Sequence, residues 1–454
     1  MDYAIQKWLI GTSFVPIRQT KKETDDVPII QTIESKCLIE AKYSIEKYYE
    51  NGLWDDYKKI TNPYEYVYLS WNKRSSRSVC DYYPLSRSYF KMIELWKMCD
   101  IGKEIEGLLQ RDEGFYSAHG AEGPGGFIEG CVNMCKKNKI EFKGASAITL
   151  YSEDKSVPGW KKAHSFLKYN PEIHINYGYD ETGNIMNTEN IDFFVEKMEE
   201  DFGKKAHIYT ADGGFDFSDN YSAQEKTVFK LLFAEILLGL KSLSKGGVLI
   251  VKCFDTCESY TIELLYCISS LFRSFGIVKP NSSRVANAER YIVGKGYVGL
   301  EEATIMYDFL LEVYKTHTDE KSFLENVIDK DFKQMLYDVQ QSIEQNEYIN
   351  ILNTIELIKT SEMPQIRSYI KSNVLKSIDW CIYHGERINK LWSEKIDLQI
   401  IQESIELMNL LHPDKHKHVV VNKNVSWFVN KDKDCISFEE FGKRRMKKET
   451  INHV

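Results

Sequence analysis

The chain has 454 residues, 43% of them hydrophobic and 13% aromatic, which is ample for the cores of two or three domains. Its net charge of −8 excludes a protein that coats nucleic acid with a generally basic surface. Any contact with nucleic-acid phosphates must therefore come from Lys and Arg clustered on one local surface. No apolar run reaches 18 residues, and the first residues lack the basic-then-apolar pattern of a signal peptide, so we expect a cytoplasmic protein with no membrane segment.

The first 60 residues contain a helical pattern from Ile33 to Tyr49, preceded by a polar stretch at residues 21–26. We therefore expect a helical N-terminal extension over residues 1–60. Four aromatic residues follow at nearly alternate positions, namely Tyr64, Tyr66, Tyr68 and Trp71. Such rings either stack on a nucleic-acid base or pack in a core at the period of a β-strand, and both alternatives stay open.

A glycine-rich stretch follows the apolar run from Phe115 to Ala121 and precedes a helical pattern. It comprises Glu122, Gly123, Pro124, Gly125, Gly126 and Phe127. Glycines let a backbone turn sharply and approach a ligand, and the helix would present free N–H groups at its N-terminus. The stretch is typical of a nucleotide-type cofactor loop, although a plain strand-to-helix turn uses the same glycines.

The segments downstream have the spacing of a doubly wound α/β sheet. A strand pattern over residues 207–212 ends in Asp212, and a second one over residues 248–251 is followed by Lys252. Helical patterns cover residues 222–243 and 260–275, and further strand-like segments lie at 277–284 and 287–296. Because ligands bind beyond the carboxyl ends of strands in such sheets, we expect Asp212 and Lys252 to face one crevice.

The ten cysteines form no two-by-two metal pattern. Cys131 and Cys135, like Cys253 and Cys257, are separated by three residues, whereas zinc and redox motifs commonly have a gap of two. We expect buried free thiols in a reducing compartment and no bound metal.

Beyond Gly299 the sequence has a helical pattern, with only one proline and one glycine between residues 301 and 408. We expect a helical C-terminal domain over residues 300–454 that braces the rest or binds a protein partner. The stretch 430–440 lacks the glycine that a calcium-binding loop needs for its turn, so we do not expect it to bind calcium. The histidines at 412, 416 and 418 are separated by lysines, which predicts an exposed charged loop. The basic run 443–448 is either a solvated tail or a tether for RNA.

The central region resembles the FtsJ-like ribose 2'-O-methyltransferases, which use S-adenosylmethionine. The Lys-Asp-Lys-Glu tetrad of that family is matched by Lys91 in Ser86-Arg-Ser-Tyr-Phe-Lys91, Asp212 in Thr210-Ala-Asp212-Gly-Gly, Lys252 in Val251-Lys252-Cys-Phe and Glu289 in Asn287-Ala-Glu289-Arg-Tyr. The residues are most similar to the branch that methylates messenger RNA caps, which has relatives in large cytoplasmic DNA viruses. Asn62-Pro63-Tyr64-Glu65 and Lys279-Pro280 before Ser283-Arg284 carry that likeness, which covers residues 61–299.

The resemblance implies a Rossmann-like methyltransferase sheet and assigns the catalytic roles. Lys252 would contact and deprotonate the ribose 2'-oxygen, or stabilise the developing alkoxide as a cation. An ordinary lysine is protonated at pH 7, so a role as base needs a lowered pKa. Lys91 would lower that pKa, whereas Asp212 and Glu289 would raise it, and the sequence leaves the balance open.

For S-adenosylmethionine, the resemblance implies that the loop Glu122–Phe127 passes the methionine end of the cofactor and that Asp212 contacts its ammonium. In the cap branch an acidic residue before an isoleucine contacts the adenine amine. Here that position is Asn184 before Ile185, which keeps an acceptor oxygen but no charge. We expect a weaker adenine contact, with a plain turn residue as the alternative.

We therefore expect an S-adenosylmethionine-dependent RNA 2'-O-methyltransferase acting on the first transcribed nucleotide of capped messenger RNA. Methylation of ribosomal or transfer RNA by the same tetrad, and a non-catalytic RNA-binding or scaffold subunit, are the alternatives. Candidate RNA contacts, with solvated surface charge as their alternative, are Lys73, Arg74, Arg77, Arg87, Lys161 and Lys162. A composition rich in Lys, Asn, Ile and Tyr fits a viral protein, which would act in the host cytoplasm or the virion.

Overall fold

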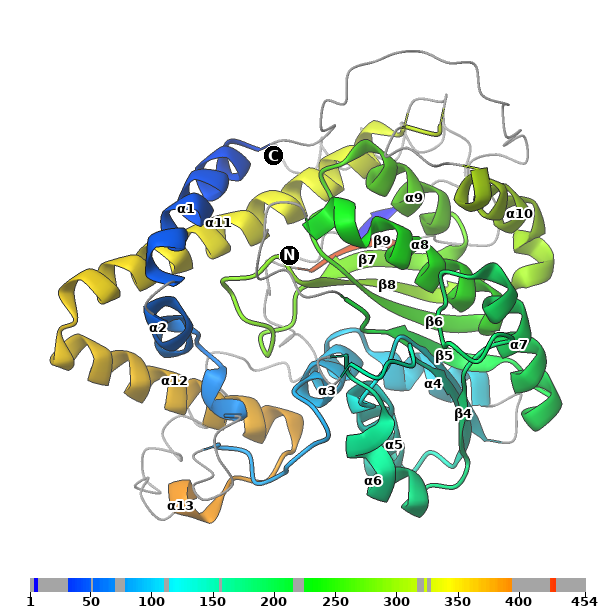
Figure 1. Ribbon diagram of the computed structural model, residues 1–454, viewed down its shortest axis with the longest axis horizontal. Coiled ribbons are helices and arrows are strands. Elements are labelled where there is room, and N and C mark those ends of the chain that lie inside the picture. The colour runs from blue at the N-terminus through cyan, green and yellow to red at the C-terminus, as the bar shows by residue number, and fades with distance from the viewer. Residues whose placement is uncertain are drawn as a thin grey trace, which may run out of the picture.

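The computed structural model describes residues 4–6, 32–49, 52–69, 78–109, 114–154, 157–214, 224–316, 322–324, 328–393 and 425–429. Within these ranges one sheet of nine strands runs through the molecule in the order β1-β9-β7-β8-β6-β5-β2-β3-β4 (Figure 1). The strands are β1 Ala4–Gln6, β2 Phe115–Gly120, β3 Phe142–Ile148, β4 Ile173–Asn176, β5 Ala206–Ala211, β6 Leu243–Cys253, β7 Phe272–Val278, β8 Arg290–Tyr297 and β9 Val425–Val429.

The strand order confirms the doubly wound fold. From β2 the chain builds outward through β3 to β4, then returns to the other side of β2 for β5 and β6, and all of these pairs are parallel. Strand β8 inserts between β6 and β7 and runs antiparallel to both. The direction of building therefore reverses between β2 and β5, so the carboxyl ends of these two strands border the crevice where such folds bind ligands.

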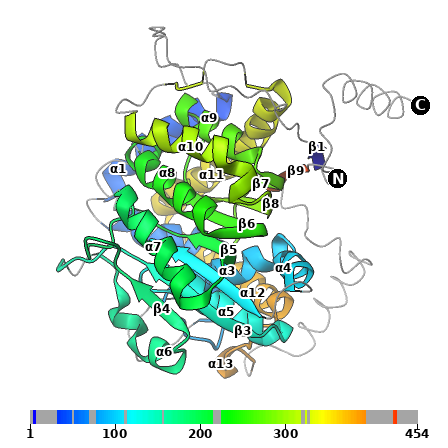
Figure 2. The ribbon, with the colours of Figure 1, turned by 90° about the vertical axis from the view of Figure 1, so that its right-hand side faces the viewer.

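Helices cover both faces of the sheet (Figure 2). They are α1 Ile33–Tyr49, α2 Leu53–Thr61, α3 Ser88–Met98, α4 Ile101–Leu109, α5 Gly126–Asn138, α6 His164–Tyr169, α7 Thr188–Phe202, α8 Gln224–Ser242, α9 Ser259–Ser269, α10 Leu300–Thr316, α11 Lys330–Thr360, α12 Met363–His384 and α13 Lys390–Ser393, with short 3-10 turns at Glu65–Val67 and Trp160–Ala163.

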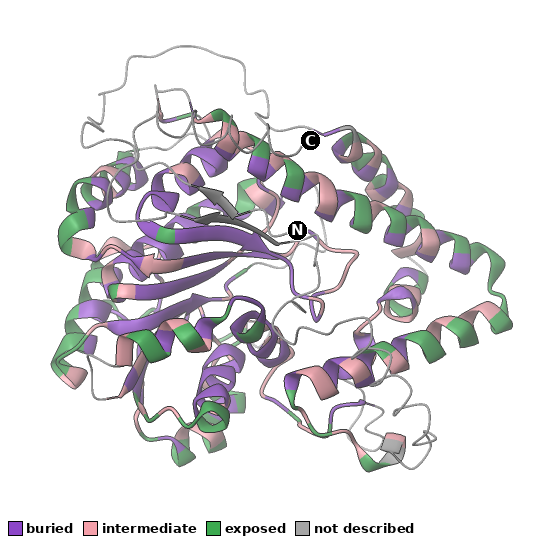
Figure 3. Ribbon diagram, turned by 180° about the vertical axis from the view of Figure 1, so that it is seen from behind, coloured by how far each residue is buried: buried purple, intermediate pink, exposed green. Residues whose placement is uncertain are grey.

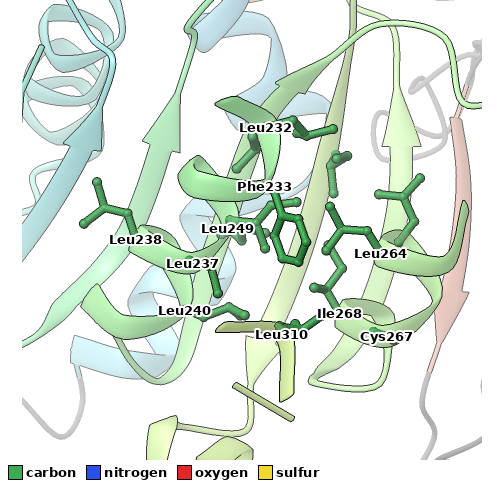
Figure 4. Packing of buried hydrophobic residues seen from close by; sticks show 14 of the residues in the cluster. Leu232, Phe233, Leu237, Leu238, Leu240, Leu249, Leu264, Cys267, Ile268 and Leu310 are labelled. Carbon is green, nitrogen blue, oxygen red and sulfur yellow. The ribbon is translucent and has the colours of Figure 1, made fainter. Parts of the chain in front are cut away.

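Strand β6 shows why two layers form, since its side chains alternate between two cores. Leu249 and Val251 join a core with helices α7 to α10, whereas Val248 and Ile250 join a core with α3, α4 and α5. Each of these four residues is fully buried, and Figure 3 shows the central strands as buried over most of their length. In the first core, leucines of α8 pack against Leu249 and against α9 and α10 (Figure 4). This burial on both faces is typical of a parallel sheet between helical layers.

A third, smaller core joins the two helical parts of the chain. Apolar residues of α1, Trp54 of α2 and three isoleucines of α11 pack together; the set is Leu38, Ala41, Ile45, Trp54, Ile351, Ile355 and Ile358. Figure 1 shows α1 beside α11, with α2 between α11 and α12. Helices from before and after the sheet therefore form one unit at its side.

Most expected elements are confirmed, with two corrections. The helix expected at 33–49 is α1, the one expected at 222–243 is α8, and the region after residue 299 is helical through α10, α11 and α12. The helix expected at 260–275 ends at Ser269, because Phe272 begins strand β7, where apolar residues at 271, 272 and 275 fit either period. The N-terminal and C-terminal regions, both expected to be helical, also contribute strands: β1 pairs parallel with β9, and β9 pairs antiparallel with β7.

Several expectations fall on residues outside the described ranges: the polar lead-in at 21–26, the calcium-like stretch 430–440, the histidines at 412, 416 and 418, and the basic run 443–448. Among the described residues, no helix is long and apolar enough to span a bilayer.

Candidate active site

The structure brings the four tetrad residues together at the crevice. Lys91 lies on α3, Asp212 directly follows β5, Lys252 is the penultimate residue of β6, and Glu289 directly precedes β8. Lys91 Nζ lies 2.8 Å from Glu289 Oε2, and Lys252 Nζ lies 3.5 Å from Asp212 Oδ1. Lys252 Nζ also donates a hydrogen bond of 2.8 Å to the main-chain oxygen of Asp212. The tetrad therefore forms two largely buried ion pairs, each within reach of the other's charge.

The charges of the site decide the balance that the sequence left open. Burial lowers the pKa of Lys252, but the carboxylates of Asp212, Glu289 and Glu235 outweigh burial and leave that pKa above its usual value. Burial alone would raise the pKa of Glu289, yet Lys91 and Lys252 bring it down to about 2. In the free protein Lys252 is thus an ammonium and Glu289 a carboxylate at neutral pH.

Tyr291 is a site residue that sequence reasoning missed. Its hydroxyl donates a 2.7 Å hydrogen bond to Asp212 Oδ1, and on the sheet it lies opposite Lys252. Its ring centroid is 5.7 Å from that of Phe127 and 5.9 Å from Lys91 Nζ. A usable signal existed, because Tyr291 lies two residues after Glu289 at the start of a strand, where alternate side chains share a face.

Glu235, on α8, is a second missed residue. Its Oε1 accepts a 3.0 Å hydrogen bond from the main-chain N–H of Gly213, so it holds the turn that carries Asp212. Burial, with a smaller contribution from Asp212, raises the pKa of Glu235 to about 8, against the lowering effects of Lys252 and the Gly213 N–H. The sequence signal is a lone carboxylate in the apolar stretch Phe233–Leu238.

The glycine-rich loop differs from expectation at the start of α5. Glu122 Oε1 accepts hydrogen bonds from the main-chain N–H groups of Phe127 (2.7 Å) and Ile128 (3.2 Å). The sequence predicts N–H groups free for a ligand at this helix N-terminus. These two are instead occupied, because the preceding carboxylate caps the helix. Gly125 has a φ of 100°, which favours glycine, and a Cβ on Gly126 would lie 2.2 Å from the Ser86 hydroxyl.

The chemistry at this loop fits the methionine end of S-adenosylmethionine. The second carboxyl oxygen of Glu122, Oε2, is buried and has no hydrogen-bond partner. Burial and the Asp212 charge raise the pKa of Glu122 well above its usual value. A cationic ammonium placed between these two carboxyl groups would supply the missing partner of Glu122 and favour the charged form of Glu122.

Asn184 lies in a tight turn beside the end of β3. Its Oδ1 accepts a 3.1 Å hydrogen bond from the main-chain N–H of Met186, and its main-chain oxygen accepts one of 2.9 Å from Asn190 Nδ2. A Cβ on the neighbouring Gly183 would lie 1.9 Å from the main-chain oxygen of Thr149, so the turn packs against the residue that follows β3. These bonds support the turn role, and the adenine contact stays a prediction.

The expected RNA contacts divide into three groups. Lys161 and Lys162 are exposed, as a contact or a solvated charge would be. Arg87 is tied into the fold, since its NH1 pairs with Glu65 at 2.9 Å. The remaining candidates lie outside the described ranges, namely Trp71, Lys73, Arg74 and Arg77.

The tyrosines near residue 66 and the cysteines have structural roles. Tyr68 is 8% exposed, with its ring 5.6 Å from that of Phe90, and Tyr64 and Tyr66 pack against the same core, which supports core packing over base stacking. Cys131, Cys135 and Cys253 are buried free thiols and Cys257 is half-buried. The part of the chain that the structure describes holds no cluster of side chains suited to a metal ion.

A cavity of about 800 Å³ opens beside Glu289. Helices α1, α2 and α11 form one wall, and the segments 254–258 and 284–289 form the other. Its lining includes seven carboxylic residues against four cationic ones, together with the aromatic side chains of Tyr43, Tyr49, Trp54 and Phe254. Sequence reasoning did not anticipate this cavity, because its walls come from segments about 300 residues apart.

Comparison with known proteins agrees with this geometry. The FtsJ-like methyltransferase family model matches residues 84–297. Cap-specific mRNA (nucleoside-2'-O-)-methyltransferase 1 of Dictyostelium discoideum is 30% identical over 306 residues, which cover 64% of this chain and 38% of that protein. EP424R of African swine fever virus, named as a methyltransferase, is 35% identical over 150 residues, or 32% of this chain and 34% of that protein.

A Caenorhabditis briggsae protein named inactive cap-specific mRNA (nucleoside-2'-O-)-methyltransferase 1B is 24% identical over 402 residues, or 85% of this chain and 46% of that protein. The chain thus spans less than half the length of these three relatives. Residues 84–297, which hold the whole tetrad and the glycine-rich loop, belong to the FtsJ-like methyltransferase family.

Proposed function

We propose that this chain transfers a methyl group from S-adenosylmethionine to the ribose 2'-oxygen of the first transcribed nucleotide of capped messenger RNA. The observation that carries the proposal is the tetrad itself, two lysines and two carboxylic residues in two ion pairs at the carboxyl ends of β5 and β6. The names of the Dictyostelium and viral relatives support a methyltransferase.

When bound, S-adenosylmethionine supplies an electrophilic methyl group. Glu122 and Asp212 would hold the ammonium of its methionine end, and Asn184 would lie near its adenine. Lys252 would place Nζ at the 2'-oxygen. Because Lys252 is an ammonium in the free protein, the role that these charges favour is stabilising the negative charge that develops on the oxygen, while the hydroxyl proton leaves to water.

Lys91 and Glu289 would help to position the reacting groups. Their 2.8 Å ion pair keeps the Glu289 carboxylate beside both the cavity and the charge of Lys252. Holding the oxygen in line with the methyl group is worth several kcal/mol in such reactions, on the order of 7–11 at most.

The charge and the aromatic lining of the cavity favour a capped RNA end as the substrate. Its excess of carboxylic over cationic residues would repel a phosphate backbone but would attract the positively charged base of 7-methylguanosine. The aromatic rings in its lining offer faces for such a cation. Ribosomal or transfer RNA has no cationic base of this kind at its end, so the cavity chemistry favours capped messenger RNA.

A scaffold without catalysis is the second candidate, because one relative of this chain is named inactive. Transfer of a tritiated methyl group, followed by digestion to nucleosides, separates the two. The protein should methylate a short capped RNA at the first nucleotide, fail when that nucleotide is 2'-deoxy, and work poorly without the cap. Equal activity on uncapped RNA would refute the cap as part of the substrate. No transfer to any RNA despite cofactor binding would favour the scaffold.

We also propose the division into an N-terminal helical extension (1–60), a methyltransferase domain (61–299) and a helical C-terminal domain (300–454). Helix α11 supports a bracing role for the last part, since Glu344, Glu347 and Ile351 line the cavity. We propose that the protein acts on messenger RNA in the cytoplasm, which is the host cytoplasm if the protein is viral. We also propose that the helical region binds a protein partner.

A further inference from the structure

The segment between β7 and β8, residues 279–289, carries five residues that line the cavity: Arg284, Ala286, Asn287, Ala288 and Glu289. It begins at Lys279, whose side chain is only 5% exposed. Lys279 Nζ donates hydrogen bonds to Asn287 O (2.7 Å), Asn287 Oδ1 (2.9 Å) and Glu289 O (2.8 Å). One buried ammonium thus draws the two ends of the segment together.

These three bonds match the three N–H groups of a lysine ammonium, and they go to Glu289 of the tetrad and to Asn287, two residues before it. The rest of the segment is held by other elements. Glu94 of α3 accepts the main-chain N–H groups of Asn281 (2.6 Å) and Ser282 (2.8 Å). Glu65 pairs with Arg284 at 2.9 Å. Glu94 and Glu65 therefore fix the first half of the segment, and Lys279 fixes the half that leads into Glu289.

We propose that Lys279 is a positioning residue for methyl transfer: its ammonium sets Asn287 at the cavity wall and Glu289 opposite Lys91. The proposal rests on the methyltransferase function proposed above and deepens it. Lys279 touches no reacting atom in this scheme. It acts through the main chain that carries Glu289, whose carboxylate then aligns Lys91 at 2.8 Å.

Because the Lys279 ammonium is buried, we expect the hold that it has on the segment to depend on pH. Burial lowers the pKa of Lys279 to about 8, although Glu347 of α11, Glu289 and Asp255 raise it; Arg290 of β8 lowers it further. Above that pH the neutral amine keeps two N–H donors and turns a lone pair toward one of its three acceptors. The segment should then loosen, and methyl transfer should fall as the pH rises through about 8.

The test compares Lys279→Met and Lys279→Arg with a matched control, Lys295→Met. Lys295, on β8, likewise donates to a main-chain oxygen, that of Cys99 (3.0 Å), but it lies opposite Val248, at the other end of the β6–β8 pairing from Lys252. Hydrogen exchange of peptides covering residues 281–290 is measured at pH 7 in the full-length protein, together with kcat and KM for methyl transfer to capped RNA.

We expect Lys279→Met to exchange faster in this segment and to lose about a hundredfold in kcat, the scale for a displacement of about 1 Å at a reacting centre. Affinity for S-adenosylmethionine, measured by calorimetry, should stay within about twofold. Lys279→Arg, which stays charged, should recover part of kcat and lose the fall above pH 8. The control should match the wild type in exchange and in kcat.

Unchanged exchange in Lys279→Met, or faster exchange with wild-type kcat, would overturn the proposal. So would an alkaline fall that persists in Lys279→Arg. A wild-type protein that methylates no RNA would instead refute the function, and the exchange data would still decide whether Lys279 holds the segment.

Discussion

Removing the hydroxyl of Tyr291 should test how the tetrad is aligned. Tyr291→Phe deletes one donor to Asp212 Oδ1 at 2.7 Å and keeps the buried ring against Phe127. A hydrogen bond to a charged group contributes about 1.5–3 kcal/mol, and each 1.4 kcal/mol is a factor of ten. If Asp212 must be aligned for transfer, kcat/KM should fall roughly tenfold to hundredfold.

The same strand offers a matched control. Tyr297, eight residues after Glu289 on β8, is 1% exposed and its hydroxyl has no hydrogen-bond partner. Tyr297→Phe therefore removes an equally buried oxygen that aligns nothing, and it should leave kcat/KM unchanged. The assay is initial-rate methyl transfer at saturating capped RNA with varied cofactor. A Tyr291→Phe rate within twofold of the wild type, or an equal loss in both variants, would refute the reasoning.

Three further outcomes are expected. Lys252→Ala should leave calorimetric affinity for S-adenosylmethionine nearly unchanged and lower transfer by about two orders of magnitude or more, and near-wild-type turnover would contradict its role. The Glu289 pKa of about 2, against a usual 4.5, means that its pairing stabilises the fold above pH 4.5 and is lost as the pH falls toward 2. The melting-temperature difference between wild type and Glu289→Gln should therefore shrink over that interval, and a constant difference would refute the pairing. Tyr43 is 60% exposed at the cavity, so Tyr43→Ala should keep its fold but raise KM two- to fivefold for capped RNA only, given about 0.5–1 kcal/mol for an exposed cation–π contact; an equal rise for uncapped RNA would argue against a cap there.

The tetrad could be named from sequence because each member lies in a short motif that resembles the FtsJ-like family, and three of the four, Asp212, Lys252 and Glu289, lie at strand ends. Asp212 and Lys252 follow apolar runs, and parallel strands bring their carboxyl ends to one edge. Local pattern also located α1 and α8 closely. It failed at Phe272, where hydrophobic residues serve helix and strand periods alike.

The remaining features depend on pairings between distant segments. The effect of Glu235 on Lys252, for example, needs α8 to lie beside the turn after β5. The sign of the Lys252 pKa shift could not be read from residue types, since it depends on how close three carboxylates lie to one amine. Distances of this kind are properties of packing, and sequence spacing does not contain them.

The small core shared by α1 and α11 has a consequence for synthesis on the ribosome. Helix α1 leaves the exit tunnel early, but Ile351, Ile355 and Ile358, which cover its apolar side, are made about 300 residues later. Throughout that interval Leu38, Ala41 and Ile45 lack their final neighbours, which makes the nascent chain a client for holding chaperones. Strands β2 to β8 can pair once residue 297 has emerged, whereas β9 and the wall of the cavity that α11 supplies follow later. Under the proposed function, the cofactor site would therefore form before the site that holds the RNA.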